Sequence, residues 1–133
     1  MELKEFAEII LFGTNISSDK LLDPKILTDE IPYKEIIAPK TPGRPLALQF
    51  NQNLNSKKIP FPNREQIEDE IQRGYVLHFF ANHELLAMEI MALVLLLFPQ
   101  APKNFRMGIA RTIIEEQKHM SLYLKRMKEY YEK

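Results

Sequence analysis

Apolar residues are concentrated in the second half of the chain, in one long segment without proline. Residues 85–98 read LLAMEIMALVLLLF and are apolar except for Glu89, and Pro99 ends the run. Asn63 is a suitable N-cap, and several acids follow it within the first turns, where the helix dipole favours negative charge. The pattern therefore predicts one long, largely buried helix over 63–98.

A second helix is predicted over 103–131, after a short break bracketed by Pro99 and Pro102. At about 100° per residue, one stripe of this helix is mostly apolar, with Glu116 in its middle and His119 just past its edge. So short a connection makes the two helices antiparallel neighbours. The other members of the stripe are Ile109, Thr112, Ile113, Met120, Tyr123, Leu124 and Met127.

The first 62 residues are predicted to form a mostly irregular arm, because seven of the nine prolines precede residue 63. Such an arm normally packs over a scaffold. Its expected elements are a helix over 2–12, a short turn over 20–22 capped by Ser18, a tight turn at 41–45 and an extended piece over 46–50. Together with the two helices, the arm gives one all-α domain over 1–133.

Composition excludes several classes of function. The chain has 18 basic and 18 acidic residues, so the formal net charge is zero, and a nucleic-acid partner is not expected. Cysteine is absent, which excludes a disulfide scaffold, a cysteine zinc site, an iron–sulfur cluster and a thiol nucleophile. The apolar run is shorter than the roughly 18–20 residues that span a membrane, so a buried helix is favoured. Peripheral membrane attachment through residues 93–98 is a further alternative.

The N-terminus does not resemble a secretory signal, because Glu2, Glu5 and Glu8 interrupt its apolar residues. A cytoplasmic location is therefore expected. Two acids in the apolar helix need neutralising, since no lysine or arginine occurs between Arg73 and Lys103. These acids, Glu84 and Glu89, require a metal, a histidine or a distant arginine, and Arg106 and Arg111, early in the second helix, are the nearest candidates.

Glu116 and His119 are spaced i and i+3, so their side chains are neighbours on the helix surface and can share one metal ion. Ferritin-like bundles hold iron or manganese with this Glu-x-x-His spacing. The alternative is a structural pair, such as Glu84 with an arginine or His119 with a backbone carbonyl. Glu89 lies about 140° around the helix from Glu84, so both cannot easily bind one centre, and Glu89 is expected at a rim or bonded to a histidine.

Several segments together resemble a known family. They are LHFFANHELLAME at 77–89, FPQAP at 98–102, FR at 105–106 and EEQKH at 115–119, preceded by PGRP at 42–45. The chain resembles, over about residues 40–130, the uncharacterised ferritin-like proteins called the DUF455 family. The resemblance implies that Glu84, Glu116 and His119 are metal ligands. Outer residues that could support them are His83, Glu89, Tyr123 and Glu115.

The resemblance also implies a difference in length, because members of the family are usually about twice as long and carry further ligands in their later part. A dinuclear carboxylate site needs a Glu and a Glu-x-x-His from each of two hairpins, and this chain provides one set. Either two chains pair about a two-fold axis and rebuild a four-helix bundle, or the chain is a fragment or a degenerate version.

Two functional hypotheses follow. The first is a non-haem dinuclear iron or manganese protein, formed at a homodimer interface and acting in oxidation or metal handling on an unidentified substrate. The second is a non-enzymatic helical module for oligomerisation or partner docking, in which the acids and the histidine form structural polar pairs.

Overall fold

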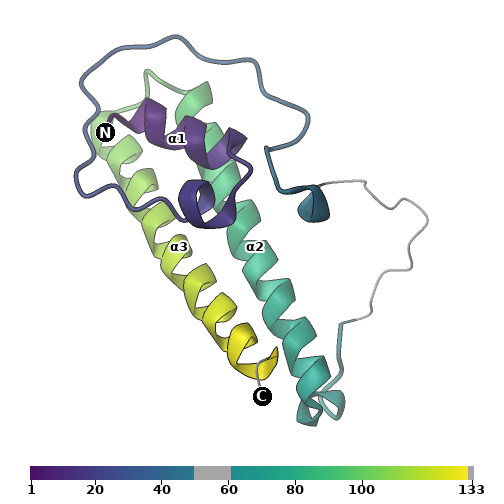
Figure 1. Ribbon diagram of the computed structural model, residues 1–133. Coiled ribbons are helices and arrows are strands. Elements are labelled where there is room, and N and C mark those ends of the chain that lie inside the picture. Colours follow the sequence, from purple (N-terminus) through teal and green to yellow (C-terminus); the bar gives the residue numbers. More distant parts are fainter. Residues whose placement is uncertain (50–60, 132–133) are drawn as a thin grey trace.

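Two long antiparallel helices dominate the computed structural model, which describes residues 1–49 and 61–131 (Figure 1). Helix α2 spans Glu70–Leu97 and helix α3 spans Lys103–Tyr131. The turn at 98–102 joins them, and α3 covers the range expected from the sequence. Within the described residues the only β pairing is an isolated bridge between Glu2 and Thr28, so the expected all-α fold is confirmed.

Helix α2 begins seven residues later than the sequence predicted. The side chain of Asn63 accepts from the backbone N–H of Gln66, and the Gln66 side chain accepts from the backbone N–H of Asn63. This reciprocal capping box starts a 3-10 turn over Gln66–Glu68 rather than the long helix. Asp69 then adopts an extended backbone, and its carboxylate accepts from the N–H of Ile71 as the true N-cap of α2.

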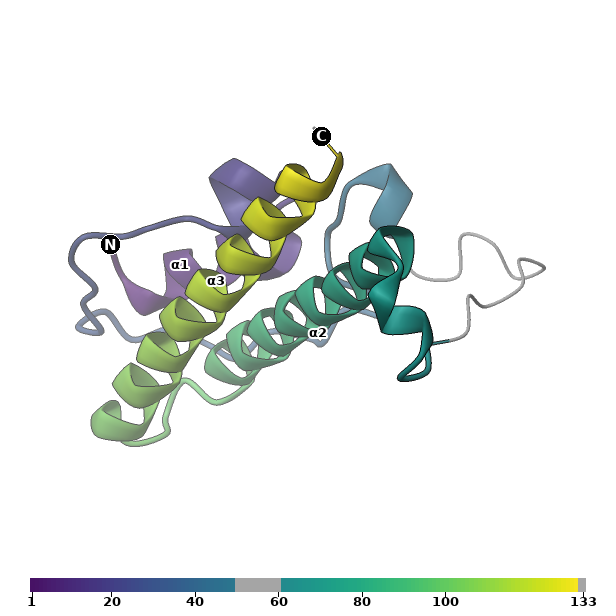
Figure 2. The ribbon, with the colours of Figure 1, turned by 90° about the horizontal axis from the view of Figure 1, so that it is seen from below.

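The arm begins with helix α1 (Leu3–Phe12), followed by a π-helical turn over Ile16–Lys20. Asn15 caps this turn by accepting from the N–H of Ser18, so the prediction that Ser18 itself is the cap was wrong. An asparagine just before the turn offers its acceptor oxygen at the position where the free backbone donors lie. In Figure 2, α1 and this turn lie on one side of the α2–α3 pair.

The remainder of the arm is mostly irregular, as its prolines indicate. A 3-10 turn over Leu46–Leu48 replaces the extended piece expected at 46–50, and residue 50 lies outside the described residues. Gly43 donates its backbone N–H to the carbonyl of Leu11. A Cβ at Gly43 would fall 1.9 Å from the carbonyl oxygen of Phe12, so only glycine allows this close approach.

Arg106 anchors the arm to the turn between the long helices. Its buried guanidinium donates to the carbonyls of Leu95 and Phe98 and forms an ion pair with Asp29, 2.8 Å from Nε to Oδ2. It also donates to the hydroxyl of Tyr33, whose pKa is raised by burial. One side chain therefore satisfies carbonyls left free at the end of α2 and holds the middle of the arm beside them.

The core lies between α1 and one face of the helix pair. Leu3, Phe6 and Ile10 of α1 are fully buried there, together with residues from both long helices. The buried apolar residues contributed by α2 and α3 are Ala81, Leu85, Met88, Ala92, Leu95, Leu96, Ala110, Ile113 and Met120.

Helix α2 is also long and apolar enough, by length and composition alone, to cross a membrane. Of the 18-residue stretch that meets this criterion, 39% is buried inside the protein.

Candidate metal centre

Three side chains that could ligate a metal converge between the two long helices. Glu84 comes from α2, and Glu116 and His119 come from α3. One ligand atom of each lies within 4.8 Å of the others. Nδ1 of His119 lies 3.4 Å from Oε2 of Glu116 and 3.9 Å from Oε2 of Glu84. The structure thus brings together the three residues proposed as ligands.

The helix pair explains this convergence. Glu116 and His119 are one turn apart on α3 and therefore share a face. The antiparallel arrangement brings the middle of α2, where Glu84 lies, beside the middle of α3 (Figure 1). The Glu84 and Glu116 side chains retain only 19% and 21% exposure, whereas His119 retains 49%. The cluster therefore sits at the border of the helix contact and is open on one side.

The donor set fits a first-row divalent metal. Two carboxylates and one imidazole suit iron, manganese or zinc. Ligand atoms on opposite sides of one ion lie about 4–4.8 Å apart, given metal–ligand bonds of ~2.0–2.4 Å. All three ligand atoms lie within 4.8 Å of one another, and Nδ1 of His119 lies 3.4 Å and 3.9 Å from the two carboxylate oxygens, so no separation exceeds the distance across one ion. Within the described part of the chain, His119 is the sole ion-pair partner of Glu84 and Glu116.

The outer residues named from the sequence lie near the triad on the helices but contact other groups. His83 packs against the ring of Phe79, with 4.4 Å between ring centroids. Tyr123 stacks on Phe80 at 5.8 Å, one helical turn beyond His119. Glu115 points to solvent, where Lys118 pairs with it at 3.2 Å. Their suggested support of the ligands stays a prediction.

Glu89 occupies a different environment, on the side of α2 covered by the arm. Its carboxylate accepts hydrogen bonds from Nζ of Lys20, at 2.8 Å, and from the guanidinium of Arg44, whose Nε lies 3.0 Å from Oε1. We call these three residues the arm clasp. All are buried, and Lys20 also donates to the carbonyl of Ile10 at the end of α1. Burial lowers the pKa of Lys20, and the neighbouring Glu89 opposes that change.

The clasp corrects two expectations from the sequence. Glu89 is bonded to cations of the arm rather than to a histidine, and neither Arg106 nor Arg111 neutralises it. Arg106 binds Asp29 instead. The partners were missed because they lie 69 and 45 residues away in sequence, within a segment that has no periodic pattern. The single acid within an apolar run was the available signal, and it indicated a distant cation without naming one.

Two further polar side chains join the arm to the helices. Asn82 of α2 accepts from Nη1 of Arg44 at 3.2 Å. Gln117 of α3, 7% exposed, donates to the carbonyls of Lys20 and Leu22. The Gln117 bonds satisfy two backbone carbonyls of the arm, and the Asn82 bond satisfies a donor of the Arg44 guanidinium. Sequence reasoning did not single out either residue.

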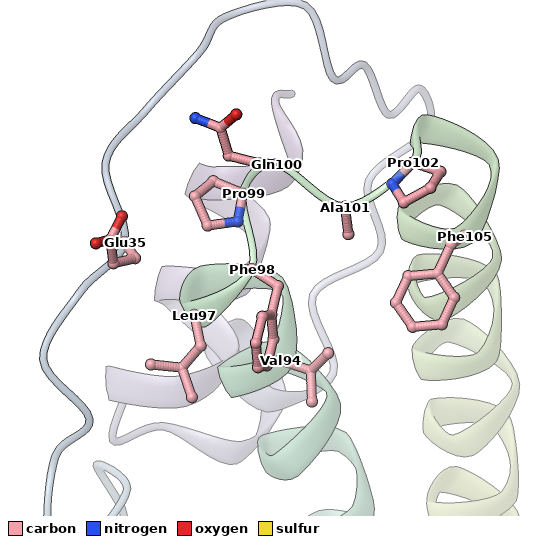
Figure 3. A pocket seen from close by; sticks show the side chains of 9 residues that line it. All are labelled: Glu35, Val94, Leu97, Phe98, Pro99, Gln100, Ala101, Pro102 and Phe105. Atoms are coloured by element: carbon pink, nitrogen blue, oxygen red, sulfur yellow. The ribbon is translucent and has the colours of Figure 1, made fainter.

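An open apolar pocket lies below the turn that joins α2 to α3. It has a volume of about 650 Å³, and in Figure 3 Phe98 and Phe105 extend into the same space from the two helices. Glu35 is the only ionisable residue among its lining residues. The pocket lies at the end of the helix pair, away from the middle where the triad sits.

Comparison with known proteins places the chain in a family but gives no activity. No curated protein and no solved structure matches it. One family model matches residues 14–132, and its description is "Protein of unknown function (DUF455)". The match begins earlier than residue 40, so it includes much of the arm as well as both long helices. The chain therefore belongs to the DUF455 family.

Proposed function

We propose that this protein binds iron or manganese through Glu84, Glu116 and His119, and that a second copy completes a dinuclear, ferritin-like centre. The observation that carries the proposal is the convergence of the three ligand atoms within 4.8 Å, on two helices of one hairpin. Glu-x-x-His on one helix and Glu on its neighbour are half of the set found in dinuclear carboxylate bundles. The reaction class would be oxidation or metal handling.

The chain's own residues have separable roles in such a centre. Glu84 and Glu116 supply negative charge, and each carboxylate offers two oxygens with which it would hold a metal ion. His119 supplies a neutral nitrogen when deprotonated. A bound iron or manganese ion would supply redox chemistry with open coordination positions. The half-exposed side of His119 leaves a direction from which a second chain or a small molecule can approach.

Elemental analysis of protein purified without chelator tests the proposal, followed by anaerobic addition of iron(II) to a chelator-treated sample. We expect about one tightly held ion per chain. Glu116→Ala should abolish this binding while the protein stays folded, and the matched control Glu129→Ala, an exposed acid on the same helix, should bind normally. Protein that is isolated without metal and also refuses iron(II) would contradict the proposal and favour the non-enzymatic module.

A further inference from the structure

Helix α2 carries a packing stripe on the side of the triad. Its members alternate in spacing by four and three residues, which is the spacing of a helix that packs against other helices along its length. None of them is buried, and Phe80 and Phe98 are 40% and 57% exposed. The stripe consists of Phe80, Glu84, Ala87, Met91, Val94 and Phe98.

Helix α3 carries a matching stripe with the same spacing. It too has no buried member, and Phe105 at its start is 51% exposed. The stripe consists of Phe105, Ile109, Thr112, Glu116, His119 and Tyr123. The two stripes meet at the triad and end at the pocket beneath the turn, where Phe98 and Phe105 share one opening (Figure 3). We call the two stripes together the open face.

The open face is apolar toward its ends, and its acids lie between them, nearer the end away from the turn. Its only carboxylates are Glu84 and Glu116, and neither stripe contains a lysine or an arginine. A two-fold axis through the triad would place the four carboxylates of two copies against one another and apolar positions on either side of them. Like charges at such short range oppose association, and two divalent cations would balance the four negative charges.

We infer that the open face binds a second copy of this chain and that a divalent metal ion at the triad is required for this association. The inference rests on the proposed function and adds its regulation: in the absence of metal, the acids of the triad keep the copies apart. A second copy is the occupant because both stripes have a spacing suited to helices, and because the ligand set is half of a two-fold symmetric one.

The size of the open face supports dependence on metal. Each stripe covers 18 residue steps, or about 27 Å, and two adjacent helices are roughly 20 Å wide. The face is therefore roughly 500 Å² per chain, and two copies would bury at most about 1,000 Å², which is near the lower limit for a specific interface. Such an interface is weak by itself, so repulsion at the triad suffices to prevent association, and shared ligands suffice to restore it.

Sedimentation velocity on the full chain, with manganese(II) or with EDTA, tests the inference, and calorimetry on the same samples measures manganese binding. We expect monomer in EDTA and dimer with manganese, with self-association at least about tenfold tighter. Manganese binding to a protein that stays monomeric, or dimerisation that is equal in EDTA, would overturn the inference and leave the proposed function intact. Absence of manganese and iron binding would overturn both.

The double variant Glu84→Gln/Glu116→Gln gives a sharper test, because it keeps side-chain shape while removing both charge and metal binding. We expect this variant to self-associate in EDTA at least about tenfold more tightly than the wild type does, and manganese should have no further effect. Circular dichroism would check that the helices are retained. Glu129→Gln is the matched control, since it removes one charge from an exposed position of α3 outside the open face. A folded double variant that stays as monomeric as the wild type in EDTA would overturn the inference.

Discussion

Glu84 and Glu89 lie five residues apart on the same apolar helix, and their surroundings differ in kind. Glu89 faces the arm and is neutralised within the chain by Lys20 and Arg44. Glu84 faces the other side. Its ion-pair partner in the described residues is His119, which also pairs with Glu116. Of the two acids, only Glu89 receives cations from the described part of the arm.

This difference separates a structural site from a candidate functional one. Burying a carboxylate without a partner costs free energy. In the arm clasp the chain itself supplies the partners of Glu89, which are Lys20 and Arg44. The triad is half-buried, holds two carboxylates with one imidazole, and is open on one side. A cation from solution is the simplest way to complete it. Substitutions at the two acids should therefore change different properties.

The largest effect is expected at the clasp. Glu89→Gln leaves the charges of Lys20 and Arg44 buried without their counterion, so the free energy of unfolding should fall by about 3–5 kcal/mol. Urea denaturation followed by circular dichroism measures this loss. Glu115→Gln, at an exposed position, is the control and should change stability by less than about 0.5 kcal/mol. Equal stability of the two variants would show that the charge of Glu89 contributes no more to the free energy of unfolding than an exposed charge does.

The next effect is expected at the triad and depends on metal. Manganese(II) at about 100 times its Kd should stabilise the wild type by about 2.7 kcal/mol, and Glu84→Gln should lose most of this gain. In EDTA the same variant should unfold within about 1 kcal/mol of the wild type, because the charge that it removes pairs only loosely, with Nδ1 of His119 at 3.9 Å. Thermal melts with and without manganese measure both quantities. A large loss in EDTA would indicate a structural pair, as at Glu89.

A smaller effect is expected from Lys20→Met. The substitution removes donors from Glu89 and from the carbonyl of Ile10, but it leaves the Arg44–Glu89 pair and relieves the burial of one excess cation. The free energy of unfolding should fall by about 1–2 kcal/mol, less than for Glu89→Gln. Urea denaturation measures this loss as well. A greater loss than for Glu89→Gln would show that Lys20, rather than the acid, is the centre of the clasp.

The smallest effect concerns pH and the start of the arm. Hydrogen bonds from the Thr28 hydroxyl, and then from the backbone N–H of Ile31, lower the pKa of Glu2 below its usual 4.5. A carboxyl whose pKa is lower in the folded state stabilises the fold above pH 4.5, and this contribution is lost as the pH falls through the lower folded value. The difference in stability between wild type and Glu2→Gln should therefore shrink on acidification, as urea titrations at pH 6 and pH 3 can show.

The sequence was informative where neighbours along the chain decide the structure. The helix over 103–131 and the shared face of Glu116 and His119 follow from local spacing, and the short connection made Glu84 a suitable partner. The start of α2 was misplaced because Asn63 and Asp69 are both competent caps, and sequence alone does not say which begins the long helix. The clasp could not be predicted, because its cations come from an irregular arm whose path is set by tertiary packing.

The central claim is that Glu84, which no lysine or arginine among the described residues neutralises, is a metal ligand. Calorimetric titration of chelator-treated protein with manganese(II), wild type beside Glu84→Gln, tests it most directly. The account predicts about one ion per chain for the wild type and an affinity lower by about 100-fold or more for the variant. Equal binding by the two proteins, or none by either manganese or iron(II) in the wild type, would contradict it.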